Sequence, residues 1–558
     1  MSQAGSSSRL SGRQAGANSQ SIQSRYSSRM NIDAGLKTYQ ITLIMSILIF
    51  PAIGGAINTG LLIGFGDALS RLITYTFVGS IVFLVLSALG EVASFSPEPT
   101  SVHTNANRFC GPALGFTLGW IYWLKYMIVI INQLTAGVFV ISYWKNVRVG
   151  EKAVYITGFL VVILSMNYWS SRFLGRYEVA LSSFKILTVL MLMILSLVIA
   201  FGGGPDHERK GFQYWKWPGA FANSADRTAL GVFRAIFRTF PSTTLSYLGT
   251  ELIGMAVLHT REPRKAAARA VKQTFYRILA LNLIVVTLLG IVIPYDEDIL
   301  ALPKYNSKKS ASAFVVAVHM AHIVVLPDIL NACILIFVIS AATRALCMAT
   351  RIIRELSLEK NAPVFLRRLD KRGVPVFALG ASAAPGLLGY LNLLGFSTHL
   401  WRYLVNLVTM FSLLTWASIL IMHISFVRAR KTQQIPDVEV PFKAPFGVFG
   451  SWTALVLCIS IPIMRAIELS DRNFYKNGPD VWAIVTSYLG IPLYFALVLG
   501  YKIGSRRKGR SGRDKVESST RRSTETQQET ETDGAGRRET SIRAPPLWKG
   551  RALPVWLI

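Results

Sequence analysis

Residues 51–60 read PAIGGAINTG, and they lie inside a stretch without charge, residues 39–66. A bilayer crossing needs about 20 apolar residues, so this stretch is long enough to span a membrane. Three glycines and an asparagine within residues 54–60 make a poor continuous helix. Irregular backbone is tolerated at membrane depth only where it lines a cavity. The stretch therefore predicts a broken transmembrane helix whose free N–H groups face a cavity and suit a carboxylate.

A second interrupted stretch, residues 241–254, reads PSTTLSYLGTELIG. It combines a proline, two glycines and an acidic residue inside an otherwise apolar run. The two stretches fall in the first and sixth predicted spans. Interrupted helices at corresponding places in two halves are typical of transporters with inverted repeats and a site at the membrane midplane. The alternative is that the small residues only allow helices to pack closely.

Composition supports a membrane protein. Of the 558 residues, 51% are apolar and 16% are charged, and the mean hydropathy is +0.40. Globular chains usually carry about a quarter charged residues. A soluble enzyme, a collagen-like fibre, a disulfide scaffold and a fully disordered chain are excluded. The remaining class is an all-α polytopic membrane protein, and a window of one membrane thickness finds twelve candidate spans: 39–63, 72–96, 113–143, 151–170, 179–202, 230–258, 277–294, 313–346, 376–396, 401–426, 448–468 and 480–502.

The distribution of charge predicts the orientation. The net charge is +29 and is concentrated in the tails and in the loops 259–277, 351–373 and 427–447. Basic loops stay on the cytoplasmic side, so twelve spans with both ends in the cytoplasm fit the pattern. Nucleic acid is not expected as a partner, because no foldable unit carries a basic stripe. The basic segments instead suit anionic lipids of the bilayer.

Three regions follow from this reading. Residues 1–38 contain few large apolar residues and are expected to be a disordered cytoplasmic tail. Residues 39–502 form the membrane domain. Residues 503–558 form a second basic tail, which is expected to be mostly disordered in the cytoplasm.

Several motifs, in order along residues 35–505, carry a family resemblance. The chain resembles fungal amino acid permeases of the amino acid–polyamine–organocation superfamily. The matching stretches are IGGAINTGL at 53–61, ALGE at 88–91, RFCGPALGF at 108–116, GTELIG at 249–254, EPRK at 262–265, RGVP at 372–375 and PFKAPF at 441–446.

The resemblance implies a LeuT-like bundle in which helices one to five and six to ten are inverted repeats and helices one and six are broken. It also implies amino acid uptake coupled to protons, with no other cofactor and no metal. The substrate carboxylate is expected against the first broken helix and the ammonium against freed carbonyls of both. The implied substrate-binding residues are Ala56, Ile57, Asn58, Thr59, Gly60, Ser246, Tyr247, Gly249 and Thr250. Tyr247 would be an aromatic gate, or alternatively an ordinary core side chain.

Four of the charged residues within the predicted spans are candidates for a functional role. Glu251 should face the interior and pair, either to hold the broken helix or to relay protons. Lys185 matches a lysine that replaces a sodium ion in relatives, although it could instead extend to the membrane surface. Arg344 replaces small polar residues of relatives and stays permanently charged. Lys125 lies near the middle of the third span, where a cation is costly and usually functional.

Two functions remain open. The first is a secondary transporter that imports amino acids across the plasma membrane by alternating access. The second is a permease-like sensor that binds an amino acid without transporting it, an alternative raised by Asn58, Gln133 and Arg344, which depart from the family pattern. An enzyme is not expected, because no catalytic constellation, phosphate loop or metal cluster is present in the sequence. The sequence specifies neither the amino acid nor the oligomeric state.

Overall fold

The structure is a computed structural model. It describes residues 68–505, except for 96–100, 146, 170, 206, 208, 220, 222–228, 252–262, 295–311, 324, 395–396, 435–439, 441 and 470–480. The first predicted span and both predicted tails therefore lie outside the described residues, and the interruption at residues 54–60 stays a prediction.

Long apolar helices dominate the described part of the chain, in which nine stretches are long and apolar enough to cross a membrane. They are α3 (Ala68–Phe95), α5 (Pro112–Ser142), α6 (Val149–Tyr168), the apolar part Ala180–Ala200 of α7 (Ser171–Ala200), α12 (Leu326–Leu358), α13 with η4 (Val376–Leu394), α14 (Ser397–Thr432), α15 (Gly447–Leu469), and Val481–Ser505, which begins with α16 (Val481–Tyr488). The expected all-helical membrane fold is confirmed.

The remaining elements complete the bundle or connect its helices. The helices α8 (Ala229–Ser246) and α10 (Pro263–Val292) fall at the sixth and seventh predicted spans. The short elements are α4 (Val102–Phe109), η1 (Trp215–Gly219), α11 (Ala313–Met320) and η3 (Val364–Arg367). Pro263 begins α10, so the predicted basic loop 259–277 is helical from that residue onward. Proline is common at this first position because its missing N–H would have no partner there.

The eighth predicted span, 313–346, was wrong as a single helix. The structure divides this region into α11, which ends at Met320, and α12, which begins at Leu326 and continues to Leu358. His322 between them has a positive φ of 55°, which ends helical geometry. A hydropathy window missed the break because the residues on both sides of it are apolar.

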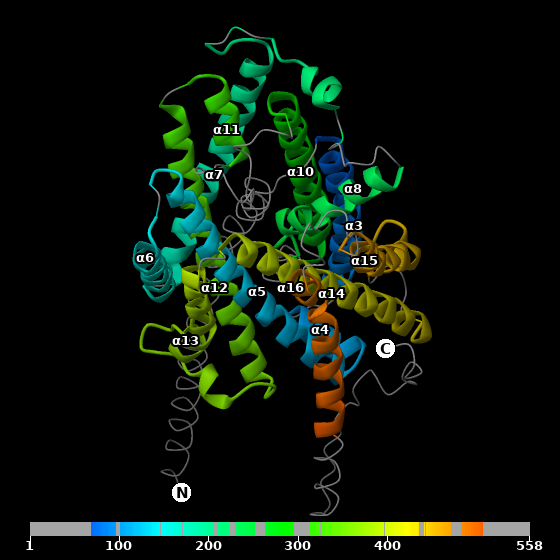
Figure 1. Cartoon of the computed structure of the whole chain (residues 1–558). Coiled ribbons are helices and arrows are strands. Elements are labelled where there is room, and N and C mark those ends of the chain that lie inside the picture. Colours follow the sequence, from blue (N-terminus) through cyan, green and yellow to red (C-terminus); the bar gives the residue numbers. More distant parts are fainter. Residues whose placement is uncertain are drawn as a thin grey trace, which may run out of the picture.

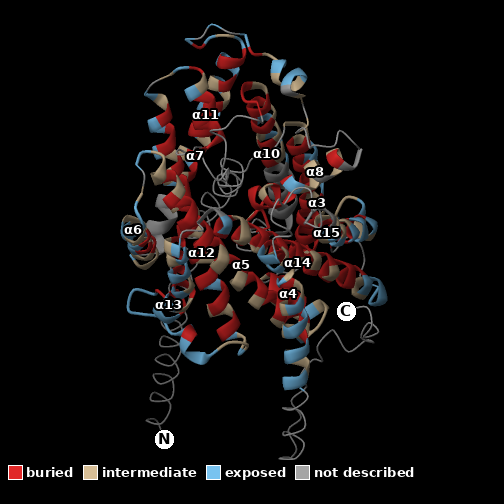
Figure 2. Cartoon of the chain, viewed as in Figure 1, coloured by how far each residue is buried: buried red, intermediate tan, exposed pale blue. Residues whose placement is uncertain are grey.

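The interior of the bundle is formed by α5, α12 and α14. The helix α5 packs against both α12 and α14, and α10 packs against α3 (Figure 1). In the most apolar window of α14, 78% of the residues are buried, compared with 17% in α6. The helix α14 is therefore central, whereas α6 lies at the periphery (Figure 2), where Val154 and Val161 are exposed.

One span is wound more tightly than the others. The helix α13 (Val376–Ala383) continues directly into η4 (Ala384–Leu394), a 3-10 helix of 11 residues. A 3-10 helix has three residues per turn, so residues three apart lie on one face. The buried residues of η4 are Gly386, Gly389 and Asn392, which share that face. The two glycines leave room for Leu134 and Leu160, because an added Cβ would lie 3.3 Å and 2.9 Å from their methyl groups.

A buried carboxylate connects three segments at one end of the bundle. Glu91 of α3 accepts hydrogen bonds from His423 Nε2 at 3.0 Å and from the backbone N–H of Ala444 at 2.8 Å. The ring of His423 also contacts the hydroxyl of Ser451 at 2.8 Å. This cluster joins the end of α3 to α14 and α15.

Candidate functional site

The sixth predicted span is interrupted as its sequence indicates. The helix α8 ends at Ser246, and residues 247–251 form a turn. Gly249 has a φ of +86°, a conformation that residues with a side chain rarely adopt. Within the turn, the hydroxyl of Thr250 donates to the carbonyl of Tyr247 at 2.9 Å. The chain thus leaves helical geometry inside the bundle, at residues that are almost entirely buried.

A ladder of buried hydroxyl groups holds α8 against α3 just before the turn. Thr74 Oγ1 lies 2.9 Å from Thr239 Oγ1 and 3.2 Å from Thr243 Oγ1. Each of these hydroxyls also lies within hydrogen-bond distance of a carbonyl of its own helix, so its single proton has an acceptor either on that helix or on the neighbouring one. The ladder fixes the position at which the turn begins.

Tyr247 packs against α3. Its side chain is fully buried, and its hydroxyl donates to the backbone carbonyl of Tyr75 at 2.9 Å. The hydroxyls of Tyr75 and Ser246 lie 2.7 Å apart, and the two tyrosine rings are 5.9 Å apart. In this structure Tyr247 occupies a packed position, the alternative to a gate. A gating role stays a prediction that requires these contacts to break.

The main charged feature of the interior is an ion pair between α5 and the turn. The ammonium of Lys125 lies 2.5 Å from Glu251 Oε1, and both side chains are buried. The other carboxylate oxygen of Glu251 accepts the backbone N–H of Gly249 at 3.2 Å. Breaking a buried pair by removing one partner typically costs about 3–5 kcal/mol, because the other charge remains unpaired. The pair therefore binds the turn firmly to α5.

Two tyrosines surround the ammonium of this pair. The Lys125 nitrogen lies 4.3 Å from the ring centroid of Tyr122 and 5.0 Å from that of Tyr126. Both distances are within the range for attraction between a cation and an aromatic ring. The hydroxyls of both tyrosines are buried and have no hydrogen-bond partner among the residues that the structure describes. Unpaired buried hydroxyls are costly, so these two hydroxyls are candidates for polar contacts with groups outside the described residues.

The two remaining charged candidates lie on neighbouring helices. Lys185 of α7 is 1% exposed, and its nitrogen lies 5.7 Å from the ring centroid of Phe337 on α12. The side chain of Lys185 is therefore covered by protein, and the depth of its ammonium in the membrane stays a prediction. Arg344, also on α12, is partly buried. Phe337 and Arg344 are seven residues apart, which is about 10 Å along a helix.

The structure brings together only part of the predicted site. Ser246, Tyr247, Gly249, Thr250 and Glu251 lie in or next to one turn. The residues expected from the first broken helix, Ala56, Ile57, Asn58, Thr59 and Gly60, lie outside the described residues. The sequence identified Lys125 and Glu251 as notable charges within the spans, but it did not predict that they form an ion pair. The signal that could have found it is the presence of single, opposite charges near the middle of two apolar spans.

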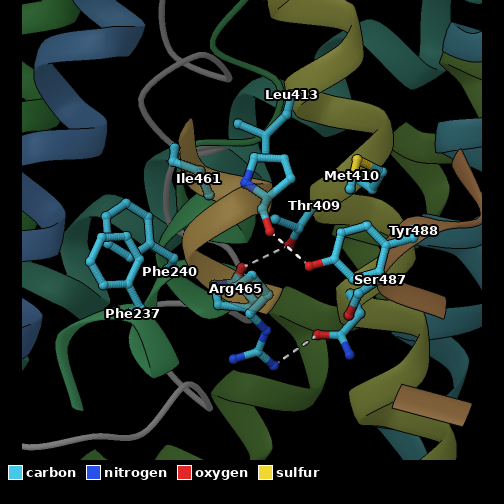
Figure 3. Close-up of a pocket in the computed structure, with 12 residues that line it drawn as sticks. Phe237, Phe240, Thr409, Met410, Leu413, Ile461, Arg465, Ser487 and Tyr488 are labelled. Carbon is cyan, nitrogen blue, oxygen red and sulfur yellow. Dashed lines mark hydrogen bonds between the residues drawn. The ribbon is translucent and has the colours of Figure 1, made fainter. Parts of the chain in front are cut away.

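A separate cleft of about 380 Å³, including its open side, lies among α8, α14, α15 and α16. In it, Arg465 contacts Asn406 at 3.5 Å, and Thr409 donates to the carbonyl of Pro241 at 3.2 Å (Figure 3). None of its lining residues belongs to the turn 247–251 or to the group around Lys125. We therefore treat the turn and the ion pair, not this cleft, as the candidate site.

Apolar helices that enclose an interrupted helix and a buried ion pair define a polytopic membrane protein with a polar interior. A family model described as amino acid permease matches residues 48–511, and the chain belongs to this family.

Three relatives, all from Saccharomyces cerevisiae, are similar over most of the chain. A dicarboxylic amino acid permease is 39% identical, with 81% of this chain and 75% of the relative covered. A proline-specific permease is 30% identical, with coverage of 85% and 75%. A basic amino-acid permease is 30% identical, with coverage of 81% and 79%.

Proposed function

We propose that this chain imports amino acids across the plasma membrane, that it prefers those with an acidic side chain, and that it does so by proton symport with alternating access. The observation that carries the preference is the fully buried Lys125, which already holds a carboxylate inside the membrane domain. The relative that is 39% identical is named a dicarboxylic amino acid permease, whereas the proline and basic permeases are 30% identical. Both facts favour an anionic side chain on the substrate.

The interior offers a physical reason for this preference. A buried cation repels a cationic substrate and gives no charge-assisted hydrogen bond to a neutral side chain. An acidic amino acid supplies one more carboxylate than a neutral amino acid does. Arg344, on the neighbouring helix α12, adds a second permanent cation.

Proton coupling is proposed through Lys185. A buried lysine can lose its proton at moderate pH, because burial disfavours the charged form. Protonated, the ammonium would stabilise one arrangement of α7 and α12, and deprotonated it would release them. The membrane orientation with both termini in the cytoplasm is part of the same proposal and rests on the basic loops.

Uptake by cells that lack their own amino acid permeases tests the substrate preference. Labelled aspartate should accumulate, and unlabelled glutamate should compete for uptake far better than lysine, proline or alanine. Preferred competition by lysine or proline would contradict the acidic preference. Saturable aspartate binding without any accumulation would instead favour the sensor alternative.

A further inference from the structure

The buried carboxylate of Glu251 has the same chemical group as the side chain of an acidic substrate. We propose that Lys125 is the receptor for the side-chain carboxylate of the transported amino acid, and that Glu251 occupies this receptor when no substrate is bound. The inference rests on the proposed function and assigns the specificity of the site to one named atom, the Nζ of Lys125.

The group around Lys125 has capacity for a carboxylate beyond its present contacts. A carboxylate offers about four positions that accept hydrogen bonds, and a lysine ammonium offers three donors. The hydroxyls of Tyr122 and Tyr126 are buried and make no hydrogen bond to any described residue. Two donors that no described residue uses thus lie in the same group as an ammonium that already binds a carboxylate.

Glu251 lies in an irregular segment of the chain, whereas Lys125 lies within a helix. It does not lie on α8 but in the turn that follows, two residues beyond Gly249 with its φ of +86°. Its second oxygen is held by the backbone N–H of Gly249, a contact within the turn itself. Glu251 can therefore leave Lys125 and keep a hydrogen bond, whereas Lys125 stays fixed within α5.

Exchange of one carboxylate for another avoids the main energetic barrier. Simple separation of the pair would leave a buried ammonium without a counter-charge, which is strongly unfavourable. If a substrate carboxylate takes the place of Glu251, the ammonium remains paired, and the displaced Glu251 takes up a proton, because a buried carboxylate without a counter-charge would be equally unfavourable. Two carboxylates cannot share the ammonium without repelling each other, so substrate and Glu251 compete. Asparagine and glutamine have nearly the same shape as the acids but cannot replace the charge, so the site should discriminate acid from amide.

A double variant tests this assignment without leaving a buried charge unpaired. Lys125→Met with Glu251→Gln removes both charges. The matched control is Lys145→Met with Glu151→Gln, which removes a pair at 2.8 Å in which the lysine is exposed. The ratio of KM for asparagine to KM for aspartate is measured for the wild type and both variants. We expect the double variant to lower this ratio about 10- to 100-fold, the loss of a hydrogen bond to a charged group, and the control to leave it unchanged.

The single variant Glu251→Gln distinguishes two roles of Glu251: competition with the substrate for Lys125, or a purely structural ion pair that holds the turn against α5. If Glu251 competes with the substrate, its replacement should lower KM for aspartate several-fold. If the ion pair is only structural, the replacement should lower thermal stability and should not improve binding. If Glu251→Gln does not fold, the double variant alone decides whether Lys125 binds the substrate carboxylate.

The results distinguish the two proposals. If the wild type does not prefer acids, the proposed function is wrong and this inference is wrong with it. If the wild type prefers acids and the double variant keeps the same ratio, only the assignment to Lys125 is overturned.

Discussion

The close contacts around a single residue determine which side chain its position can accept. Gly79 on α3 is an example, because a Cβ added there would lie 2.9 Å from the hydroxyl oxygen of Tyr247 and 2.7 Å from Leu279 Cδ1. Carbon atoms at such distances overlap, so one of the neighbours must move. The absence of a side chain at Gly79 is therefore what lets Tyr247 reach the backbone of Tyr75.

Gly79→Ala should displace Tyr247 and weaken its hydrogen bond to Tyr75. Overpacking of this kind typically costs about 1–3 kcal/mol. Thermal unfolding of purified protein in detergent should show the loss, and aspartate uptake should fall with it. Gly158→Ala on α6 is the matched control, since nothing lies within 4 Å of its added methyl group. Equal stability of the two variants would show that Tyr247 is not held as described.

At the residue scale, the sequence predicted which charged residues are important but not which residues they contact. It identified Glu251 as a charge that should face the interior and Lys125 as a costly cation near the middle of a span. It did not pair them, since 126 residues separate them along the chain and only the packing of α5 against the turn brings them together. It left two roles open for Tyr247, because a buried aromatic side chain is compatible with both.

At the scale of elements, the decisive feature is the end of α8 at Ser246. The sequence predicted an interruption here from proline, glycine and an acidic residue in one span, and the structure places the turn at 247–251. The division between α11 and α12 could not be predicted in the same way. Its residues are apolar on both sides, so a hydropathy window reads one long span where the backbone turns.

Gly249→Ala should reduce uptake strongly while it affects stability only moderately. A left-handed backbone costs a residue with a side chain about 1–2 kcal/mol, and relief of that strain would shift Glu251 relative to Lys125. Gly373→Ala is the control, because Gly373 has a similar φ of +78° in an exposed loop. Uptake per molecule at the cell surface should fall for Gly249→Ala alone. Equal losses for both would point to general destabilisation. The corresponding expectation for Gly60→Leu, in the first predicted span, stays a prediction.

At the scale of the whole molecule, two fully buried lysines lie on different helices. Lys125 of α5 is paired with Glu251, and the Lys185 nitrogen of α7 lies 5.7 Å from the ring centroid of Phe337 on α12. The proposed function gives them different tasks, binding a substrate group for Lys125 and gaining or losing a proton for Lys185.

Lys185→Ala should remove the pH response of uptake. In the wild type, uptake should rise as external pH falls, because a higher outside proton concentration drives symport, and it should not change when sodium is replaced by potassium. Lys185→Arg should also fail to respond, since a guanidinium keeps its proton. Initial rates of aspartate uptake between pH 5 and pH 8 provide the measurement. Uptake that requires sodium in the wild type would contradict the coupling scheme.

The 3-10 winding of η4 has a consequence for the thickness of membrane that this span can cross. A 3-10 helix rises about 2.0 Å per residue and an α-helix about 1.5 Å. Residues 376–394 therefore reach about 34 Å, whereas the same residues in α-helical form would reach about 28 Å. The hydrocarbon core of a bilayer measures about 30 Å, so the tighter winding turns a segment that is slightly short into one that spans fully. Rewinding η4 to an α-helix would shorten the span by roughly one turn and leave one of its ends below the membrane surface, so the bilayer itself helps to select the 3-10 form.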